Sequence, residues 1–467
     1  MNHLVWLRND LRLHDNPALY YACQSGAPVM VIYIFDEKHE AHAKLGGARA
    51  WWLESNLKFF QAFLYDKLGI TMQFYQGDSS EIIHALIAEG LVSDISWNRS
   101  YEPKHISRDQ ELKSQLLAAG VSVHSYPGNV LIEPFAITTG SGGPYRVFTP
   151  FWKNISQLNI EKPLAVPSKT SMEPVKISQR AQSIDSFKLT NSAHNWMQKL
   201  EPFWPFGEEE AFSRLNDFLP KARNYNDSRN RPDWDMTSRL SGYLTLGILS
   251  VRALWWTIKA HQQETAAQEN TYLSELGWRD FAQHLMFHFP HMTTDNYKPS
   301  FDQFPWQFDQ EVLKKWKNGQ TGYPIVDAGM RELYQTGFMH NRVRMITASF
   351  LTKHLQHDWR HGEQWFWNCL VDADTASNTA SWQWVAGSGA DAAPYFRIFN
   401  PITQGEKFDP DGTYVRKFVP ELKHVETKYI HKPWLSSRKP ASYPSPIVDH
   451  KQARLDALKS YETIKNN

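Results

Sequence analysis

The chain has 467 residues, with 50 Lys and Arg against 49 Asp and Glu. This length is enough for two or three domains, and the balanced charge excludes a uniformly basic nucleic-acid-binding protein. Its only cysteines, Cys23 and Cys369, exclude a disulfide framework and a cysteine-rich zinc site. The longest apolar run, VMVIYIF at 29–35, has the length of a strand. We therefore expect a cytoplasmic protein without a signal peptide or a membrane span.

Residues 1–130 alternate between predicted strands and helices. Runs of β-branched and aromatic residues predict strands at 3–7, 29–35, 70–77, 94–98 and 121–126. The segments between them predict helices on both faces of a parallel, Rossmann-like sheet. Asp78 with Glu81, and Ser107 with Gln110, have the spacing of helix capping pairs. The motif G-x-G-x-x-G is missing after the first strand, so no nucleotide pyrophosphate is predicted there.

Composition changes after the α/β region. Residues 131–204 include a stretch rich in Pro, Ser and Lys without periodicity, which predicts a connector between domains. Residues 205–467 are predicted to form a larger all-α domain, because apolar residues recur at helical spacing. The clearest such segments are 207–219, 248–261, 271–287, 324–337 and 341–355.

The segment DADTASNTASWQW, residues 372–384, places two carboxylates, an amide and two indoles within one short stretch. Asp372 and Asp374 follow three histidines at 354, 357 and 361, but no EF-hand series and no H-E-x-x-H occurs. We therefore predict no metal site. The absence of G-x-S-x-G likewise argues against nucleophilic hydrolysis.

Three other segments carry side chains suited to a flat, phosphate-linked ligand. TSRLSGYL at 237–244 has three hydroxyls around an arginine, typical either of an anion site or of an ordinary helix cap. Glu275, Trp278 and Arg279 share one predicted helical face, and Asn341 lies one turn before Met345. Each segment also has a structural interpretation, as an ion pair or a core methionine. Together they offer an amide, a carboxylate, an indole, a thioether and guanidinium groups.

The order of these motifs resembles the photolyase/cryptochrome family over nearly the whole chain. The motifs are LRNDLRLHDNPAL, TSRLSGYLTLGILS, ELGWRDF, GYPIVDAGMREL, MHNRVRMITASFLTKHL, DWRHGEQWF, DADTASNTASWQWVAG and FRIFNPITQGEKFDPDGTYVRKFVPEL. The chain most closely resembles the class I enzymes that repair cyclobutane pyrimidine dimers in DNA. The resemblance implies an α/β photolyase (antenna) domain at 1–130, a connector at 131–204 and a helical FAD-binding catalytic domain at 205–467.

The resemblance also implies which residues bind FAD. Around its phosphates it places Tyr225, Thr237, Ser238, Arg239, Leu240 and Ser241. Around the rest of the cofactor it places Tyr272, Arg279, Asn341, Arg344, Asp372, Asp374 and Asn378. Asn378 matches the position that faces flavin N5. Because an amide does not supply a proton as an acid does, the reduced anion FADH⁻ is the implied working state.

The tryptophans divide into two groups by the same resemblance. Trp306, Trp359 and Trp382 match an electron-transfer chain to the flavin, whereas Trp278 and Trp384 match the pair that flanks the damaged bases. Aromatic stacking of about 1–3 kcal/mol per base would roughly offset the extrusion of the dimer. The remaining implied contacts to dimer or DNA are Glu275, Asn341 and Met345 at the lesion, and Arg229, Arg342, Arg397 and Gln404 on the DNA side.

The implied function is light-dependent repair of cyclobutane pyrimidine dimers by electron transfer from excited FADH⁻ to the flipped-out dimer. The alternatives are a cryptochrome-type blue-light photoreceptor and a (6-4) photolyase. The latter carries two histidines where this chain has Asn341 and Met345. UV-damaged DNA is the implied partner, and a monomer the implied state. Folate-binding class I members carry a Glu where this chain has Lys104 and His105, which argues against a methenylfolate antenna. A folate, a deazaflavin, a second flavin and no antenna chromophore all stay open.

Overall fold

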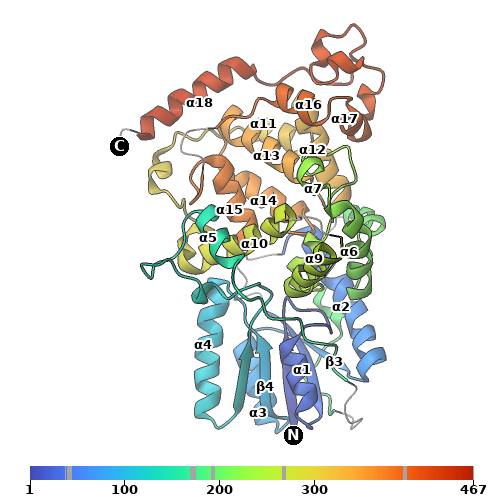
Figure 1. Ribbon diagram of the computed structural model, residues 1–467, viewed down its shortest axis with the longest axis vertical. Helices are drawn as coiled ribbons and strands as arrows, with labels where there is room; N and C mark the ends of the chain where they lie inside the picture. The colour runs from blue at the N-terminus through green and yellow to red at the C-terminus, as the bar shows by residue number, and fades with distance from the viewer. Residues whose placement is uncertain are drawn as a thin grey trace. The chain divides into compact units, whose positions relative to one another are not determined.

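Five parallel strands form the sheet of the N-terminal region, in the order β3-β2-β1-β4-β5 (Figure 1). The computed structural model describes residues 1–36, 38, 45–168, 175–190, 195–265, 270–392 and 397–465. The strands are Asn2–Leu7 (β1), Val29–Phe35 (β2), Met72–Gln76 (β3), Val92–Asn98 (β4) and Ser122–Tyr126 (β5). Every residue of β2 is buried, as expected for a parallel strand covered on both faces. The predicted strands and the α/β class are confirmed.

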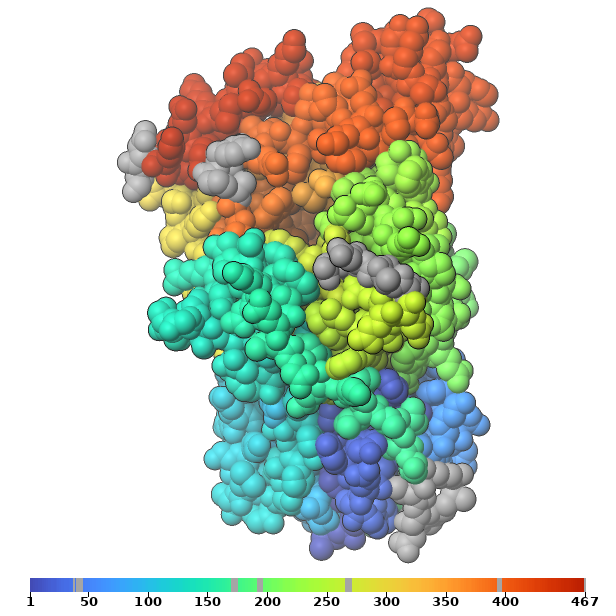
Figure 2. Space-filling view, viewed as in Figure 1, coloured from blue at the N-terminus to red at the C-terminus, as the bar shows by residue number. Residues whose placement is uncertain are grey.

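Four helices cover this sheet: Pro17–Gln24 (α1), Gly47–Leu68 (α2), Ser79–Ala88 (α3) and Pro103–Ala118 (α4). Helices α3 and α4 pack into one core cluster with the strands, whereas α1 lies in front of the sheet in Figure 1. The space-filling view shows the same segments, blue to cyan, as a closely packed surface (Figure 2). Asp78 caps α3 as predicted, accepting from the backbone N–H groups of Ser80 and Glu81.

The predicted cap at Ser107 is wrong. Helix α4 begins at Pro103, four residues earlier, and the Ser107 hydroxyl donates to the Pro103 carbonyl within the helix. Proline suits the first turn of a helix because its missing N–H has no partner there in any case. The serine spacing was therefore a feature of the helix interior.

The described chain divides into two compact units. Unit 1 contains Met1–Met197, Trp204–Arg223 and Ser238–Pro290. Besides the α/β region, it holds η1 (Pro134–Ala136), α5 (Phe148–Ile155), η2 (Ile184–Phe187), α6 (Glu208–Ala222), α8 (Ser241–Thr245), α9 (Val251–Thr265) and α10 (Asn270–His288). Unit 2 contains Gln198–Phe203, Asn224–Thr237 and His291–Asn467. The predicted boundaries at residues 130 and 204 stay a prediction.

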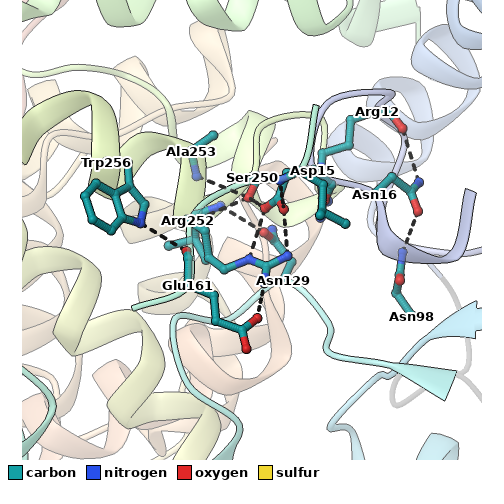
Figure 3. Close-up of polar contacts among 12 residues, drawn as sticks. Arg12, Asp15, Asn16, Asn98, Asn129, Glu161, Ser250, Arg252, Ala253 and Trp256 are labelled. Carbon is teal, nitrogen blue, oxygen red and sulfur yellow. Dashed lines mark hydrogen bonds and ion pairs between the residues drawn. The ribbon is translucent and has the colours of Figure 1, made fainter. Parts of the chain in front are cut away.

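A buried ion pair joins the loop after β1 to helix α9 within unit 1 (Figure 3). Asp15 is fully buried and accepts from Arg252 through both of its oxygens, at 2.6 and 3.1 Å. The Ser250 hydroxyl and the backbone N–H of Leu164 donate to the same carboxylate. Each charge therefore meets opposite charge or a donor inside the fold, which is the condition for keeping an ion pair away from water.

Unit 2 is helical, as predicted for the C-terminal half. Its helices are α7 (Tyr225–Ser228), α11 (Gln310–Lys317), α12 (Pro324–Thr336), α13 (Asn341–Ser349), α14 (Trp359–Cys369), α15 (Thr375–Ala386), α16 (Pro401–Phe408), α17 (Thr413–Phe418) and α18 (His450–Lys465). The shorter helical segments are η5 (Pro299–Gln303), the π-helix η6 (Phe350–His354), η7 (Pro420–Leu422), η8 (Thr427–Tyr429) and η9 (Pro433–Leu435). Two further segments, η3 (Asn195–Phe203) and η4 (Pro290–Thr293), have residues in both units. One apolar cluster that includes Trp316, Trp359 and Trp382 forms its core.

Candidate functional site

A half-satisfied carboxylate lies just before α15 in unit 2. Asp372 is buried, and its Oδ2 accepts from Nη2 of Arg344 at 2.8 Å. The guanidinium is held in turn by the carbonyl of Met339, 2.7 Å from Nε. The second oxygen of Asp372, Oδ1, is enclosed and has no hydrogen-bond partner among the described residues. An enclosed acceptor without a donor indicates a place where a ligand N–H or O–H belongs.

Helix α15 begins beside this carboxylate and carries Asn378 one turn later. Asp374 is its N-cap and accepts from the N–H of Ser377 at 2.8 Å. Asn378 is buried, and its Nδ2 donates to the backbone carbonyl of Glu363 at 3.1 Å and to its Oε1 at 3.0 Å. These two bonds fix the amide, so its orientation is set before any ligand arrives.

Sequence reasoning missed Glu363, which supports Asn378 from α14. Burial raises the pKa of Glu363 to about 7, although the Asn378 hydrogen bond acts in the opposite direction. A carboxyl group that titrates near neutral pH is typical of functional sites. The available indication was a single acid between aromatic residues in DWRHGEQWF.

The side chains of this cluster have the chemistry that FAD binding requires. Arg344 supplies a cation, Asp372 an open acceptor and Asn378 a fixed amide. The enclosed Oδ1 of Asp372 suits a hydroxyl or ring N–H of a bound nucleotide cofactor. The structure thus brings Arg344, Asp372, Asp374 and Asn378 into one region of unit 2.

The residues expected around the phosphates belong to both units, Tyr225 and Thr237 to unit 2 and Ser238–Ser241 to unit 1. Ser238 Oγ accepts from the hydroxyl of Tyr272 at 3.0 Å. Arg239 has φ of 51°, in the left-handed region, and so turns the chain just before α8. Leu240 is buried, which leaves its backbone as the part suited to a phosphate contact. Burial raises the pKa of Tyr272, which keeps its hydroxyl a neutral donor.

Helix α10 presents Glu275, Trp278 and Arg279 on neighbouring positions of unit 1. Arg279 Nη1 donates to the carbonyl of Asn129 at 2.7 Å. Trp278 is 37% exposed and stacks on Phe148 of α5, with ring centroids 3.6 Å apart and planes 10° apart. One face of the indole is thus covered by the protein, and the exposed part remains for a ligand. Phe148 is a second residue that sequence reasoning missed.

The expected DNA-side residues of unit 2 include three arginines, of which Arg229 and Arg397 lie close enough to Arg342 for their charges to act on it. Arg342 Nε and Nη2 donate to Oδ1 of Asn230 at 3.1 and 2.6 Å. Burial lowers the pKa of Arg342, and the charges of Arg229 and Arg397 lower it further. Such a cluster of like charges is suited to a phosphate backbone. Arg397 is exposed.

The other residues expected in unit 2 to contact the lesion or the DNA lie on three helices. Asn341 is exposed at the start of α13, with half-buried Met345 one turn later. Trp384 of α15 packs against the core of unit 2 and stays half-buried. Gln404 of α16 is half-buried, and its Oε1 is enclosed without a partner in the part of the chain that the structure describes.

The three tryptophans expected to carry electrons share the core of unit 2. Trp359 and Trp382 are buried within it, and Trp306 packs against it. Trp359 Nε1 donates to Oδ1 of Asn296 at 2.9 Å. Gly362 gives Trp382 room, since a Cβ there would lie 2.1 Å from the indole.

At the carboxyl end of the sheet, near β1 and β4, charged and aromatic side chains pack against one another. This crossing point is where ligands bind in sheets of this topology. Arg8 pairs with Asp109 at 2.5 Å, and the guanidiniums of Arg8 and Arg108 lie over the ring of Trp6, at 4.9 and 4.6 Å. His105 is buried beside them. An antenna chromophore stays an untested expectation.

No described helix combines the length and hydropathy needed to cross a membrane. Within the described ranges, no group of three or more His, Cys, Asp or Glu side chains is placed to hold a metal ion.

Comparison with known families places both halves of the chain. A model described as the FAD binding domain of DNA photolyase matches residues 272–463, and one described as DNA photolyase matches residues 3–168. A deoxyribodipyrimidine photo-lyase of Agrobacterium fabrum is 45% identical, over 99% of this chain and 98% of its own length. The Escherichia coli protein of the same name is 39% identical, over 99% of each.

Solved structures give the same result for the fold. A bacterial class III photolyase from Agrobacterium tumefaciens matches with a TM-score of 0.94 and 44% identity, over 100% of this chain and 98% of that one. An archaeal photolyase from Sulfolobus tokodaii, crystallised with two FAD molecules, matches with a TM-score of 0.84 and 30% identity. The match covers 99% of this chain and 100% of that one.

Proposed function

Because this chain belongs to the photolyase/cryptochrome family, we propose that it repairs cyclobutane pyrimidine dimers in DNA in a light-dependent reaction. Two expectations are confirmed at a coarser level: the chain carries the family's FAD-binding domain, and its relatives are photo-lyases. The substrate is the step that we propose. The class I subgroup is not part of the proposal, because a structure at 44% identity is a class III photolyase.

The observation that carries the proposal is the half-covered indole of Trp278. Phe148 covers one face of this ring, so a flat group arriving from solvent meets a fixed platform. Glu275 lies one helical turn earlier on α10, where its carboxylate can accept from an imide N–H of a thymine. Base stacking on such a platform is worth about 1–3 kcal/mol, comparable to the few kcal/mol that extrusion of a base costs.

Bound FAD would supply light absorption and a transferable electron, which the dimer takes up and later returns. Because the dimer would return the electron, breaking the two C–C bonds between its bases would need no net oxidant or reductant. The chain's own residues hold the groups in place. Arg344 and the open oxygen of Asp372 would hold the cofactor, and Glu363 orients the Asn378 amide. Glu275 stabilises charge that develops on the dimer, an electrostatic effect that is strong where water is excluded.

Neither Asn341 nor Met345 can act as the proton donor that (6-4) repair requires, so this substrate is disfavoured. A signalling role is the other alternative, since Cryptochrome-1 of Arabidopsis thaliana is 33% identical over 97% of this chain and 69% of its own length. That the protein is a monomer, and that it is located in the cytoplasm, stay predictions.

The test uses reduced protein loaded with FAD and two oligonucleotides, one with a cyclobutane thymine dimer and one with a (6-4) product. Each is incubated under blue light and in the dark, and repaired strands are counted by chromatography. We expect repair of the first substrate only, and only in light. Repair of neither, by protein that binds FAD and is photoreduced, would overturn the proposal in favour of the photoreceptor.

A further inference from the structure

Trp234 is an exposed aromatic residue that no part of the site described above uses. Of the 19 tryptophans, all within the described ranges, only Trp278 and Trp234 are exposed, at 37% and 49%. Indole is a large apolar group, and leaving it in water forgoes the free energy of burial. Trp278 has a proposed ligand, and Trp234 therefore calls for one.

The turn that carries Trp234 is built to hold the ring still. Its backbone N–H donates to the carbonyl of Arg231 at 3.3 Å, and Pro232 occupies the position of that turn that favours proline. The guanidinium of Arg231 lies 4.4 Å from the centre of the indole. Asp233 fixes this guanidinium with two hydrogen bonds, at 2.8 and 2.6 Å. A ring held in this way loses little conformational entropy on binding.

The same loop is tied to the arginine cluster of unit 2. Asn230, directly before Arg231, accepts two hydrogen bonds from Arg342. Arg229, one residue further back, lies close enough to Arg342 for its charge to act on it. Only four residues of chain thus separate Arg229, a member of the arginine cluster, from the exposed indole of Trp234. Basic groups interleaved with an aromatic ring are the pattern of single-strand nucleic-acid surfaces.

The charges around Trp234 decide which part of DNA it would touch. Arg231 is paired with Asp233, so it brings no net charge to the ring, and a further carboxylate follows at Asp235. A phosphate is disfavoured there, whereas a base or the apolar face of a sugar is not. We propose that Trp234 is a further DNA contact, which stacks on a base or sugar of the strand that the arginine cluster holds.

This inference rests on the proposed function, and salt dependence distinguishes stacking by Trp234 from a contact to phosphate. A contact to phosphate releases counterions and contributes about 0.9 to the slope of log affinity against log salt, whereas stacking contributes nothing to it. We expect Trp234→Ala to weaken binding of a dimer-containing oligonucleotide at least about five-fold at every salt concentration, with an unchanged slope. The DNA affinity of Trp234→Phe, which keeps a smaller ring, should lie between those of the wild type and Trp234→Ala.

The experiment is fluorescence anisotropy of a labelled oligonucleotide with FAD-loaded protein, from low to moderate salt. Phe308→Ala removes another exposed aromatic residue of unit 2, 64% exposed, and should leave affinity unchanged. Thermal unfolding and FAD content show that each variant is folded. Equal affinity of Trp234→Ala and wild type, or a change in slope, would overturn the inference alone. A wild-type protein that does not bind dimer DNA would instead overturn the proposed function.

Discussion

Asp15 in unit 1 and Asp372 in unit 2 are both buried carboxylates that face an arginine. Asp15 receives four hydrogen bonds, from Arg252, Ser250 and Leu164, and each of its oxygens accepts two (Figure 3). Asp372 receives one from Arg344, and its other oxygen is enclosed without a donor. A carboxylate that the fold satisfies completely holds the fold together. One that the fold leaves half-satisfied is suited to a ligand, and the four predictions below test this contrast.

The largest expected effect comes from Asp15→Asn. Asparagine tolerates the left-handed backbone at this residue, where φ is 57°, so only the charge and two acceptor sites are lost. Among the described residues, Arg252 would then be left with the exposed Glu161 as its ion-pair partner, 3.3 Å away. We expect a loss of about 3–5 kcal/mol in the free energy of unfolding, measured by urea denaturation of apoprotein and holoprotein.

The control for this change is Asp185→Asn, which removes an exposed partner of Lys58. It should alter stability by less than about 0.5 kcal/mol. If Asp15→Asn lowered the free energy of unfolding by less than about 1 kcal/mol, the buried ion pair would not be needed for stability. The structural role that distinguishes Asp15 from Asp372 would then be contradicted.

The second prediction concerns pH and Glu363. Its pKa is raised to about 7 by burial, above the value of an exposed glutamate, so the folded state binds a proton that the unfolded state has already lost. Stability from this group is therefore full at low pH and falls as pH rises from about 4.5 to 7. Relative to Glu363→Gln, the wild type should lose about 3 kcal/mol between pH 5 and pH 8.

Urea unfolding of both apoproteins at pH 5 and pH 8 measures this difference. Burial also raises the pKa of three other acids, to about 7 for Glu208 and to about 6 for Asp280 and Asp409. Both proteins contain these acids, so their contributions cancel in the comparison. If the free energies of unfolding of the two proteins changed equally between pH 5 and pH 8, Glu363 would ionise as it does in water. The raised pKa would then be contradicted.

The elements of the fold were largely readable from the sequence, because strands and helices leave periodic patterns. All five strands were predicted, and the capping pair at Asp78 was correct. The pair at Ser107 failed because capping spacing recurs inside helices by chance, and Pro103 had already set the start of α4. How the chain divides into two compact units depends on contacts between distant segments, which leave no local pattern.

The site was readable only where a motif lies in one short stretch. Asp372, Asp374 and Asn378 were singled out together because they share one segment. Glu363 was missed because its burial and its bond to Asn378 arise from packing of α14 against α15. Phe148 was missed because it lies 130 residues from Trp278 in the sequence. Nothing local shows that two aromatic residues so far apart will stack.

The third prediction tests the half-satisfied carboxylate directly. Asp372→Asn should lower FAD affinity about 10- to 150-fold, since a hydrogen bond to a charged group is worth about 1.5–3 kcal/mol. The apoprotein should lose less than about 1 kcal/mol, because Arg344 is partly exposed and can turn to water. Titration of apoprotein with FAD, followed by flavin fluorescence, measures the first quantity, and urea unfolding the second.

Asp358→Asn provides a matched control, since Asp358 pairs with Arg360 at 3.0 Å in the same unit and its replacement still caps α14. It should leave FAD affinity unchanged. If Asp372→Asn destabilised the apoprotein as strongly as Asp15→Asn does, its open oxygen would have no bearing on a ligand.

The smallest expected effect extends the contrast to apolar groups. Trp52 is fully buried, and Trp51, Trp204 and Tyr243 surround it, whereas Trp278 is supported on one face by Phe148 and is 37% exposed. Phe148→Leu keeps an apolar side chain behind Trp278 but removes the flat support, worth about 0.5–1.5 kcal/mol beyond buried area.

We expect Phe148→Leu to weaken binding of dimer-containing DNA about 2- to 10-fold, with little change for undamaged DNA, and Phe148→Tyr to restore it. Phe135→Leu, at an exposed aromatic residue of the same unit, should change neither affinity. Equal losses for damaged and undamaged DNA would mean that Phe148 supports unit 1 in general. A loss confined to the dimer would mean that Trp278 binds the lesion because its partner ring fixes the plane on which a base can stack.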